Sequence, residues 1–153
     1  MEFVLTNWSL SPWNSFYCSD KKYPYLKYDI IIECKNLNPV KLSKKQMNLY
    51  NKICELKNEG LKLPYVRVKI GDAKKCNVLG KAKLSKCEIW ITQKAIDNGD
   101  SELRSVVYHE LLHAIYGCNH VKGCPIMSAV QPDVVATKAK SIEIFKKYYS
   151  KYN

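Results

Sequence analysis

Arginine and histidine are both scarce in this chain. Its 153 residues include 25 lysines and arginines, but only Arg67 and Arg104 are arginines, and only three residues are histidines. Proteins that read nucleic acids tend to cluster their basic groups and to favour arginine, whose forked donors match phosphates and base edges. Here the lysines are scattered from Lys21 to Lys151. The net charge of +11 is therefore typical of a solvated surface, and we do not favour a nucleic-acid partner, although the charge leaves one open.

Long apolar runs are absent as well. No stretch has the length and hydrophobicity of a membrane-spanning helix, so we expect no membrane partner. The first residues, MEFVLTNWSLSPWNSF, lack the basic segment and unbroken apolar core of a secretory signal. We therefore expect a cytoplasmic or otherwise intracellular protein, with export by another route left open. No linker or internal repeat divides the chain, so a single domain over 1–153 is expected. We also expect the protein to be a monomer.

Paired CxxC spacings, typical of structural zinc sites, are also missing among the seven cysteines. An odd number leaves at least one thiol unpaired within the chain, and without a secretory signal reduced thiols in core positions are expected. Two pairs could oxidise after export. Cys76 and Cys87 would face each other across a hairpin, and Cys118 and Cys124 flank His120.

Hydrophobic periodicity predicts an α+β fold. Segments rich in β-branched or alternating apolar residues predict four strands, namely 25–34, 65–70 and the two arms of a hairpin over 76–93. Three helices are predicted: one from the capping box of Ser43 and Gln46 to Gly60, one capped by Asp100 or Ser101, and one after Pro132 that includes Val135. The second helix, over 103–116, is apolar on nearly every side, which indicates a central, buried element.

Polar residues in such a helix need a reason, and the stretch HELLHAIYGCNH contains all three histidines of the chain. His109 and His113 are four residues apart, so their rings project from one helical face and can meet one metal ion. Glu110 lies beside them, where a carboxylate can take a proton from a metal-bound water without joining the metal's ligands. An accidental gathering of core histidines around a buried glutamate is the competing interpretation.

A catalytic zinc site usually needs a third protein ligand and keeps its fourth position open. His120 is the candidate. Gly117 explains how it could reach the metal, because a glycine after the last helical turn can adopt a left-handed conformation and turn the chain back.

The stretch from His109 to Met127 resembles the signature of the metzincin zinc peptidases, such as matrix metalloproteinases and archaemetzincins. That signature is HExxHxxGxxH followed by a methionine in a tight turn beneath the metal. The histidines and the glutamate of HELLH match directly, and the 18-residue step to Met127 equals that of a typical matrix-metalloproteinase motif. Gly117 and His120 each come one residue later than in the signature.

The resemblance implies a fold. It predicts a twisted mixed sheet of about four strands with a helix packed on it, a central active-site helix, a Met-turn and a C-terminal helix. The parts would be an N-terminal segment (1–24), the sheet and active-site helix (25–116), and the third-ligand loop, Met-turn and last helix (117–153).

The resemblance also implies an activity: a zinc metalloendopeptidase in which His109, His113 and His120 bind Zn²⁺ and Glu110 is the base. Its substrate would be a protein or peptide held in extended form against an edge strand, here CEIWITQ (87–93), with Trp90 and Ile91 shaping the cleft. Alternating apolar residues in a strand are, however, more often part of the core. The loop 128–132, with Val130, would form the wall of the specificity pocket.

Several alternatives stay open. A glutamate from a later helix, Glu143, is the rival third ligand. Cys18 could hold a latent enzyme closed by binding the metal, but it lacks the flanking residues of that motif, so an ordinary thiol is preferred. The chain could also be a protease tethered to nucleic acid by its basic surface, or a non-catalytic module with a zincin fold.

Overall fold

Strands precede and follow the first long helix, and the central and last helices come later in the chain. A computed structural model describes residues 2–7, 26–32, 44–64, 66–71, 78–132 and 134–152. The elements are β1 (Glu2–Asn7), β2 (Leu26–Ile32), α2 (Lys44–Asn58), β3 (Val66–Gly71), β4 (Val78–Lys83), the short 3-10 helix η1 (Leu84–Lys86), β5 (Glu88–Thr92), α3 (Gln93–Asp97), α4 (Asp100–Tyr116), β6 (Val130–Gln131) and α5 (Lys138–Tyr152). Cys18, Ser43 and Cys76, which carry the predicted latency thiol, helix cap and hairpin thiol, lie outside the described residues.

The strands form one mixed sheet in the order β2-β3-β5-β4-β1-β6. β3 and β5 are parallel, whereas β2 pairs antiparallel with β3, and β4 pairs antiparallel with both β5 and β1. The four predicted strands are β2 to β5, and the predicted α+β class is confirmed. β1, inside the N-terminal segment, and β6 extend the sheet beyond the expected four strands.

The prediction that 87–93 forms a substrate-binding edge strand is wrong. β5 lies inside the sheet, with β3 on one side and β4 on the other. Its main-chain groups therefore bond to neighbouring strands and are not available to an added peptide. The physical reason is that strand order depends on pairing between distant segments, which periodicity along one segment does not encode.

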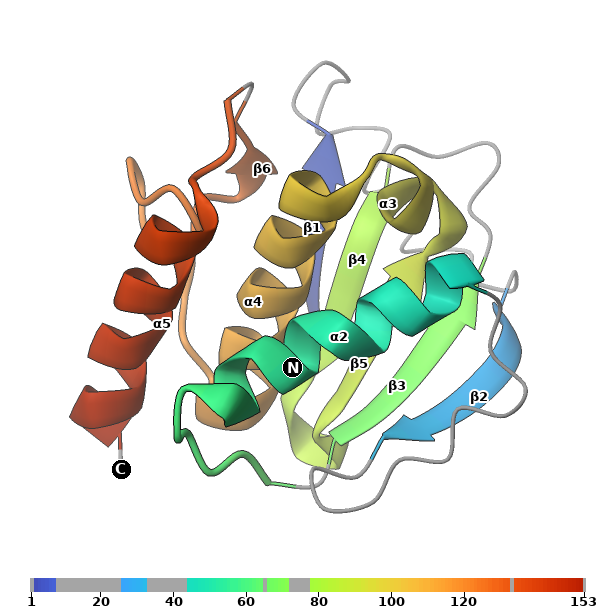
Figure 1. Ribbon diagram of the computed structural model, residues 1–153, viewed down its shortest axis with the longest axis horizontal. Coiled ribbons are helices and arrows are strands. Elements are labelled where there is room, and N and C mark those ends of the chain that lie inside the picture. Colours follow the sequence, from blue (N-terminus) through green and yellow to red (C-terminus); the bar gives the residue numbers. More distant parts are fainter. Residues whose placement is uncertain are drawn as a thin grey trace.

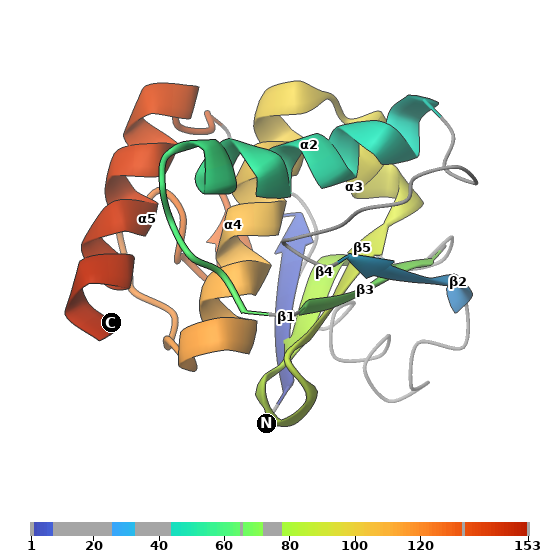
Figure 2. The ribbon, with the colours of Figure 1, turned by 60° about the horizontal axis from the view of Figure 1, so that its bottom comes forward.

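The helices cover one face of the sheet (Figures 1 and 2). Alternate residues of the central strands point into this layer, and Val68, Ile89 and Ile91 are fully buried there. α2 and α4 lie across the sheet, and α5 packs beside α4. The buried core therefore lies between the sheet and α2, α4 and α5.

α4 is the central helix, as predicted. Its residues 103–114 are all buried, because the sheet, α2 and α5 surround it. Tyr108 on α4 packs edge-on against Phe145 on α5, with ring centroids 5.5 Å apart. Among the described residues, no helix has the length and apolar character needed to cross a membrane.

Two helix starts differ from the predictions. α4 has Gly99 at its N-cap, without a side-chain bond, so neither Asp100 nor Ser101 caps it. Asp100 instead accepts a hydrogen bond from Arg104, 2.8 Å away. α5 begins at Lys138, after Val135, and the Thr137 hydroxyl accepts a hydrogen bond from the backbone N–H three residues later, at 3.2 Å. A threonine N-cap sets this start, which apolar spacing alone placed too early.

Candidate metal centre

Gly117 ends the helix that carries the motif, as predicted. It has φ 65° and ψ 27°, a left-handed conformation that glycine adopts without steric cost. Its N–H donates to the carbonyl oxygen of His113 at 3.0 Å, and the N–H of Cys118 donates to that of Leu112 at 3.3 Å. The chain thereby leaves α4 and turns back along it, with the last carbonyls of the helix hydrogen-bonded.

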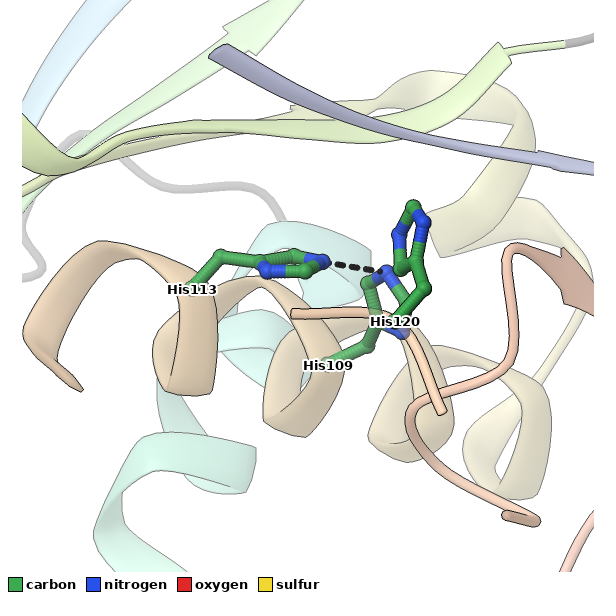
Figure 3. Close-up of side chains that lie close together, drawn as sticks. All are labelled: His109, His113 and His120. Carbon is green, nitrogen blue, oxygen red and sulfur yellow. Dashed lines mark hydrogen bonds between the residues drawn. The ribbon is translucent and has the colours of Figure 1, made fainter. Parts of the chain in front are cut away.

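This turn brings the three histidines together (Figure 3). His109 and His113 project from the same face of α4, and their ring centroids are 4.5 Å apart. His120 comes from the loop after Gly117, with its ring centroid 5.1 Å from that of His109 and 4.7 Å from that of His113. One ligand atom from each ring lies within 4.8 Å of the others. The three side chains form a group that could hold a metal ion.

Backbone carbonyls fix the orientation of the two helical rings. Nδ1 of His109 lies 2.6 Å from the carbonyl oxygen of Ile126, and Nδ1 of His113 bonds to that of Cys118. A carbonyl oxygen only accepts, so each Nδ1 carries the proton. Each neutral ring therefore presents Nε2 as a lone pair. Metal-binding histidines are commonly oriented by such a bond from the other ring nitrogen.

The two Nε2 atoms face each other at 3.0 Å (Figure 3, dashed line). With both Nδ1 atoms protonated, this contact joins two acceptors and needs a proton or a cation between them. Two nitrogens that bind one tetrahedral zinc at about 2.0–2.1 Å lie about 3.3 Å apart. The observed spacing of His109 and His113 is close to that value, so the two nitrogens are near enough to bind one metal ion.

Burial keeps these rings neutral, the form that binds metal. Burial, reinforced by the neighbouring ring of His113, holds the pKa of His109 well below 6.5. Burial also lowers the pKa of His113 to about 4, although its bond to the Cys118 carbonyl acts in the opposite direction. His120 is exposed, but the partial burial of its ring lowers its pKa too.

Glu110 is the unusual side chain of the site. It is fully buried, and neither carboxylate oxygen has a hydrogen-bond partner among the described residues. Oε1 lies 4.0 Å from Nε2 of His109. Burial raises the pKa of this carboxyl well above 4.5. A buried polar group without a partner is costly, so its presence beside the histidines points to a partner that binds there.

Arg104 and Tyr108, which are also buried polar side chains of α4, have hydrogen-bond partners. The Arg104 guanidinium donates to both carboxylate oxygens of Glu55 at 2.8 Å, and the Tyr108 hydroxyl donates to Glu55 Oε1 at 3.0 Å. Lys52, also on α2, lies 3.3 Å from the same carboxylate. The lack of a partner at Glu110 is therefore specific to the site and is not a general property of this helix.

Gly80 of β4 makes room for Glu110. A Cβ atom at this position would lie 2.6 Å from Oε2 of Glu110 and 3.0 Å from Cγ1 of Val106. Only glycine lets the strand pass so close to the carboxylate. Gly80 was not among the predicted site residues, although a glycine inside a predicted strand signals a close approach.

Within the loop 118–127, hydrogen bonds hold residues 121–127 together. The N–H of Val121 donates to the carbonyl of Met127 at 2.7 Å, and the N–H of Met127 donates to Sγ of Cys124 at 3.3 Å. Met127 is fully buried and follows Ile126, whose carbonyl orients His109. Cys124 is not disulfide-bonded, and neither is Cys118. Met127, for which a methionine turn is predicted, thus directly follows the residue whose carbonyl orients a ring of the site.

Other predicted site residues lie elsewhere. Ile91 is fully buried in the core, and Trp90, on the opposite face of β5, packs against Lys81, whose Nζ is 3.9 Å from its ring centroid. Val130 lies in β6 and pairs with β1. Glu143 is exposed on α5 and forms ion pairs with lysines, outside the histidine group.

Comparison of the chain with protein-family models, with curated proteins and with solved structures gives no match in any of the three. The function of this chain therefore has to be inferred from the geometry of the site itself.

Proposed function

We propose that this chain is a zinc-dependent metallopeptidase in which His109, His113 and His120 bind the metal and Glu110 is the general base. One observation carries the proposal: the buried carboxylate of Glu110, which has no hydrogen-bond partner in the part of the chain that the structure describes, lies 4.0 Å from Nε2 of His109. That nitrogen itself faces a second imidazole acceptor at 3.0 Å. A divalent cation bound to the rings would remove the unfavourable contact between the two acceptor nitrogens. It would also give the buried carboxylate of Glu110 a positive charge nearby.

The donor set agrees with zinc. Three neutral imidazoles are a common ligand set of catalytic zinc, and they leave one position for water or substrate. When bound, zinc supplies Lewis acidity, which polarises a carbonyl group and acidifies a water molecule. Glu110 is placed to accept the proton of that water and to deliver it to the leaving nitrogen. Its burial raises the pKa of the carboxyl above the ordinary value, and a more basic carboxylate is a stronger proton acceptor.

The choice of peptides as substrates is supported by the resemblance of HELLHAIYGCNHVKGCPIM to the metzincin signature. The helix, the glycine turn, the third histidine and the buried methionine follow each other in the order of that signature.

Metal analysis and a peptide-cleavage assay test the proposal together. We expect one zinc per chain and cleavage of a mixed peptide library by the wild type. Glu110→Gln should keep the zinc and lose at least about a hundredfold in activity, in line with removal of a general base. Glu143→Gln, which removes a carboxylate from an exposed site on α5, is the matched control and should retain activity.

Three results would contradict parts of the proposal. Equal activity of Glu110→Gln and the wild type would exclude the base. Undiminished zinc affinity of His120→Ala would exclude the third ligand. Stoichiometric zinc without cleavage of any peptide would favour a non-catalytic module.

A further inference from the structure

β1 occupies a distinctive place in the sheet. It pairs antiparallel with β4 on one side and parallel with β6 on the other, so it fills a slot one strand wide. The elements on either side come from distant parts of the chain: β4 precedes α4, and β6 follows the loop of the third histidine. Without β1, two strand edges would face each other across this slot.

The slot lies next to the base. Leu5 is paired with Gly80, and Gly80 is the residue whose missing side chain makes room for Glu110. The next residue, Thr6, is paired with Val130, three residues after Met127. In Figure 3 the rings of His109 and His113, on α4, and of His120, on the following loop, lie on the side of α4 that faces β4 and β1. Residues 5 and 6 of β1 therefore lie in the part of the sheet that is next to the candidate metal centre.

The pairing at this point is irregular. The register between β1 and β4 shifts between Leu5 and Thr6, so that Gly80 and Val78 are successive partners. β6 contributes only two residues, both paired with β1. β1 therefore has a regular ladder only with β4, over residues 2–5, and is held more weakly at its end near the site. Such an end can separate before the rest of the sheet opens.

We infer that the slot between β4 and β6 is a binding site for an extended peptide segment, and that β1 is its intramolecular occupant. Main-chain groups of both edges would bind the segment, as in other cases of strand addition. The regulatory consequence, that β1 blocks access to the catalytic centre, rests on the proposed function. The strand-binding site itself does not.

Tethering gives β1 an advantage over any peptide in solution. A segment linked to its site competes at an effective concentration on the order of millimolar. A free peptide of the β1 sequence should therefore bind weakly to the wild type and strongly once β1 is displaced. Displacement is possible with Leu5→Pro and Thr6→Pro together, because neighbouring residues of a strand direct their N–H groups to opposite sides and proline has none.

The test measures binding of a fluorescein-labelled peptide, MEFVLTN, by anisotropy. It uses the full chain carrying Glu110→Gln, so that the peptide is not consumed. We expect the double proline variant to bind more than about tenfold tighter than its parent. A scrambled peptide is the control. Glu2→Cys with Lys83→Cys, a pair in direct register, should lock β1 by a disulfide and abolish binding until reductant is added. Either single cysteine variant controls for the native thiols.

Hydrogen exchange of the unaltered chain gives a second measurement that does not depend on how the variants fold. The amides of β1 should exchange faster than those of β3 and β5, and excess MEFVLTN should accelerate them further. Exchange of β1 only together with the whole sheet would overturn the inference, as would equal peptide binding by the locked and displaced variants. Absence of peptidase activity would leave these binding results unchanged, so failure of the proposed function would be recognised separately.

Discussion

Replacing Glu110 by glutamine should stabilise the metal-free protein increasingly as the pH rises. The wild-type side chain is fully buried, has no hydrogen-bond partner among the described residues, and has a pKa that burial raises well above 4.5. Glutamine has nearly the same shape and cannot ionise. The substitution therefore isolates the free energy of burying a carboxylate at this position.

The magnitude follows from proton binding. Above pH 4.5 the unfolded chain releases the proton of Glu110, while the folded protein retains it up to its raised pKa. Over that window the free energy of unfolding of the wild type falls by about 1.4 kcal/mol per pH unit relative to the variant. The stabilising contribution of the protonated carboxyl is thus complete below pH 4.5 and is lost as the pH rises to the folded pKa. The histidines titrate in both proteins, so their effects cancel in the difference.

Urea unfolding in the presence of EDTA, followed by tryptophan fluorescence from pH 4.5 to pH 8, measures this difference. The two stabilities should be similar at pH 4.5 and should diverge as the pH increases. Glu143→Gln removes the same charge from an exposed position on α5 and is the matched control for the loss of one carboxylate. A constant difference between wild type and Glu110→Gln across this range would refute the reasoning, because it would mean that the buried carboxyl is not perturbed.

Three further predictions concern residues around the site. Gly80→Ala should lower the free energy of unfolding by about 1–3 kcal/mol and reduce peptidase activity, because the new methyl group overlaps Glu110; urea unfolding and the cleavage assay measure both. Gly117→Ala should cost about 1–2 kcal/mol and weaken zinc binding in a chelator competition, because its left-handed conformation positions the third histidine. Glu55→Ala should cost about 3–5 kcal/mol at pH 7, since it leaves Arg104 buried without its main partner.

The stability cost of Glu55→Ala depends on pH. Burial raises the pKa of Glu55, but hydrogen bonds from Arg104 and Tyr108 and the charge of Lys52 outweigh it and hold the pKa below 4.5. The stabilisation is therefore present above pH 4.5 and is lost as the pH falls through the folded pKa. The difference in the free energy of unfolding between wild type and Glu55→Ala should shrink as the pH falls. The corresponding difference between wild type and Glu110→Gln grows as the pH rises. A cost at Glu55 that is unchanged in acid would contradict the role of its charge.

Local features of the site could be predicted from the sequence because they depend on helical geometry. The four-residue step from His109 to His113 fixes a shared face, and Gly117 fixes the end of the helix. The segments of β2 to β5 were predicted for the same reason, since alternation of apolar residues is a property of one strand.

Non-local features could not be predicted in this way. β1 pairs with residues more than seventy positions later in the chain, and nothing in MEFVLTN specifies that partner. The same limitation caused the error about β5, whose alternation of Ile89, Trp90 and Ile91 does not reveal whether one or two strands flank it. Gly80 was missed because its importance arises only from the side chain of Glu110 beneath it.

The one-residue departure from the metzincin signature can be accommodated by the way α4 ends. One additional helical residue moves the end of the helix by about 1.5 Å and rotates it by about 100°. Gly117 and His120 are displaced together, so the histidine keeps the three-residue distance from the glycine that the signature has. The following loop is one residue shorter, and the bond between Val121 and Met127 closes it. Because the carbonyls of Cys118 and Ile126 still reach the two helical rings, the longer helix and shorter loop leave all three imidazoles close enough for one ion.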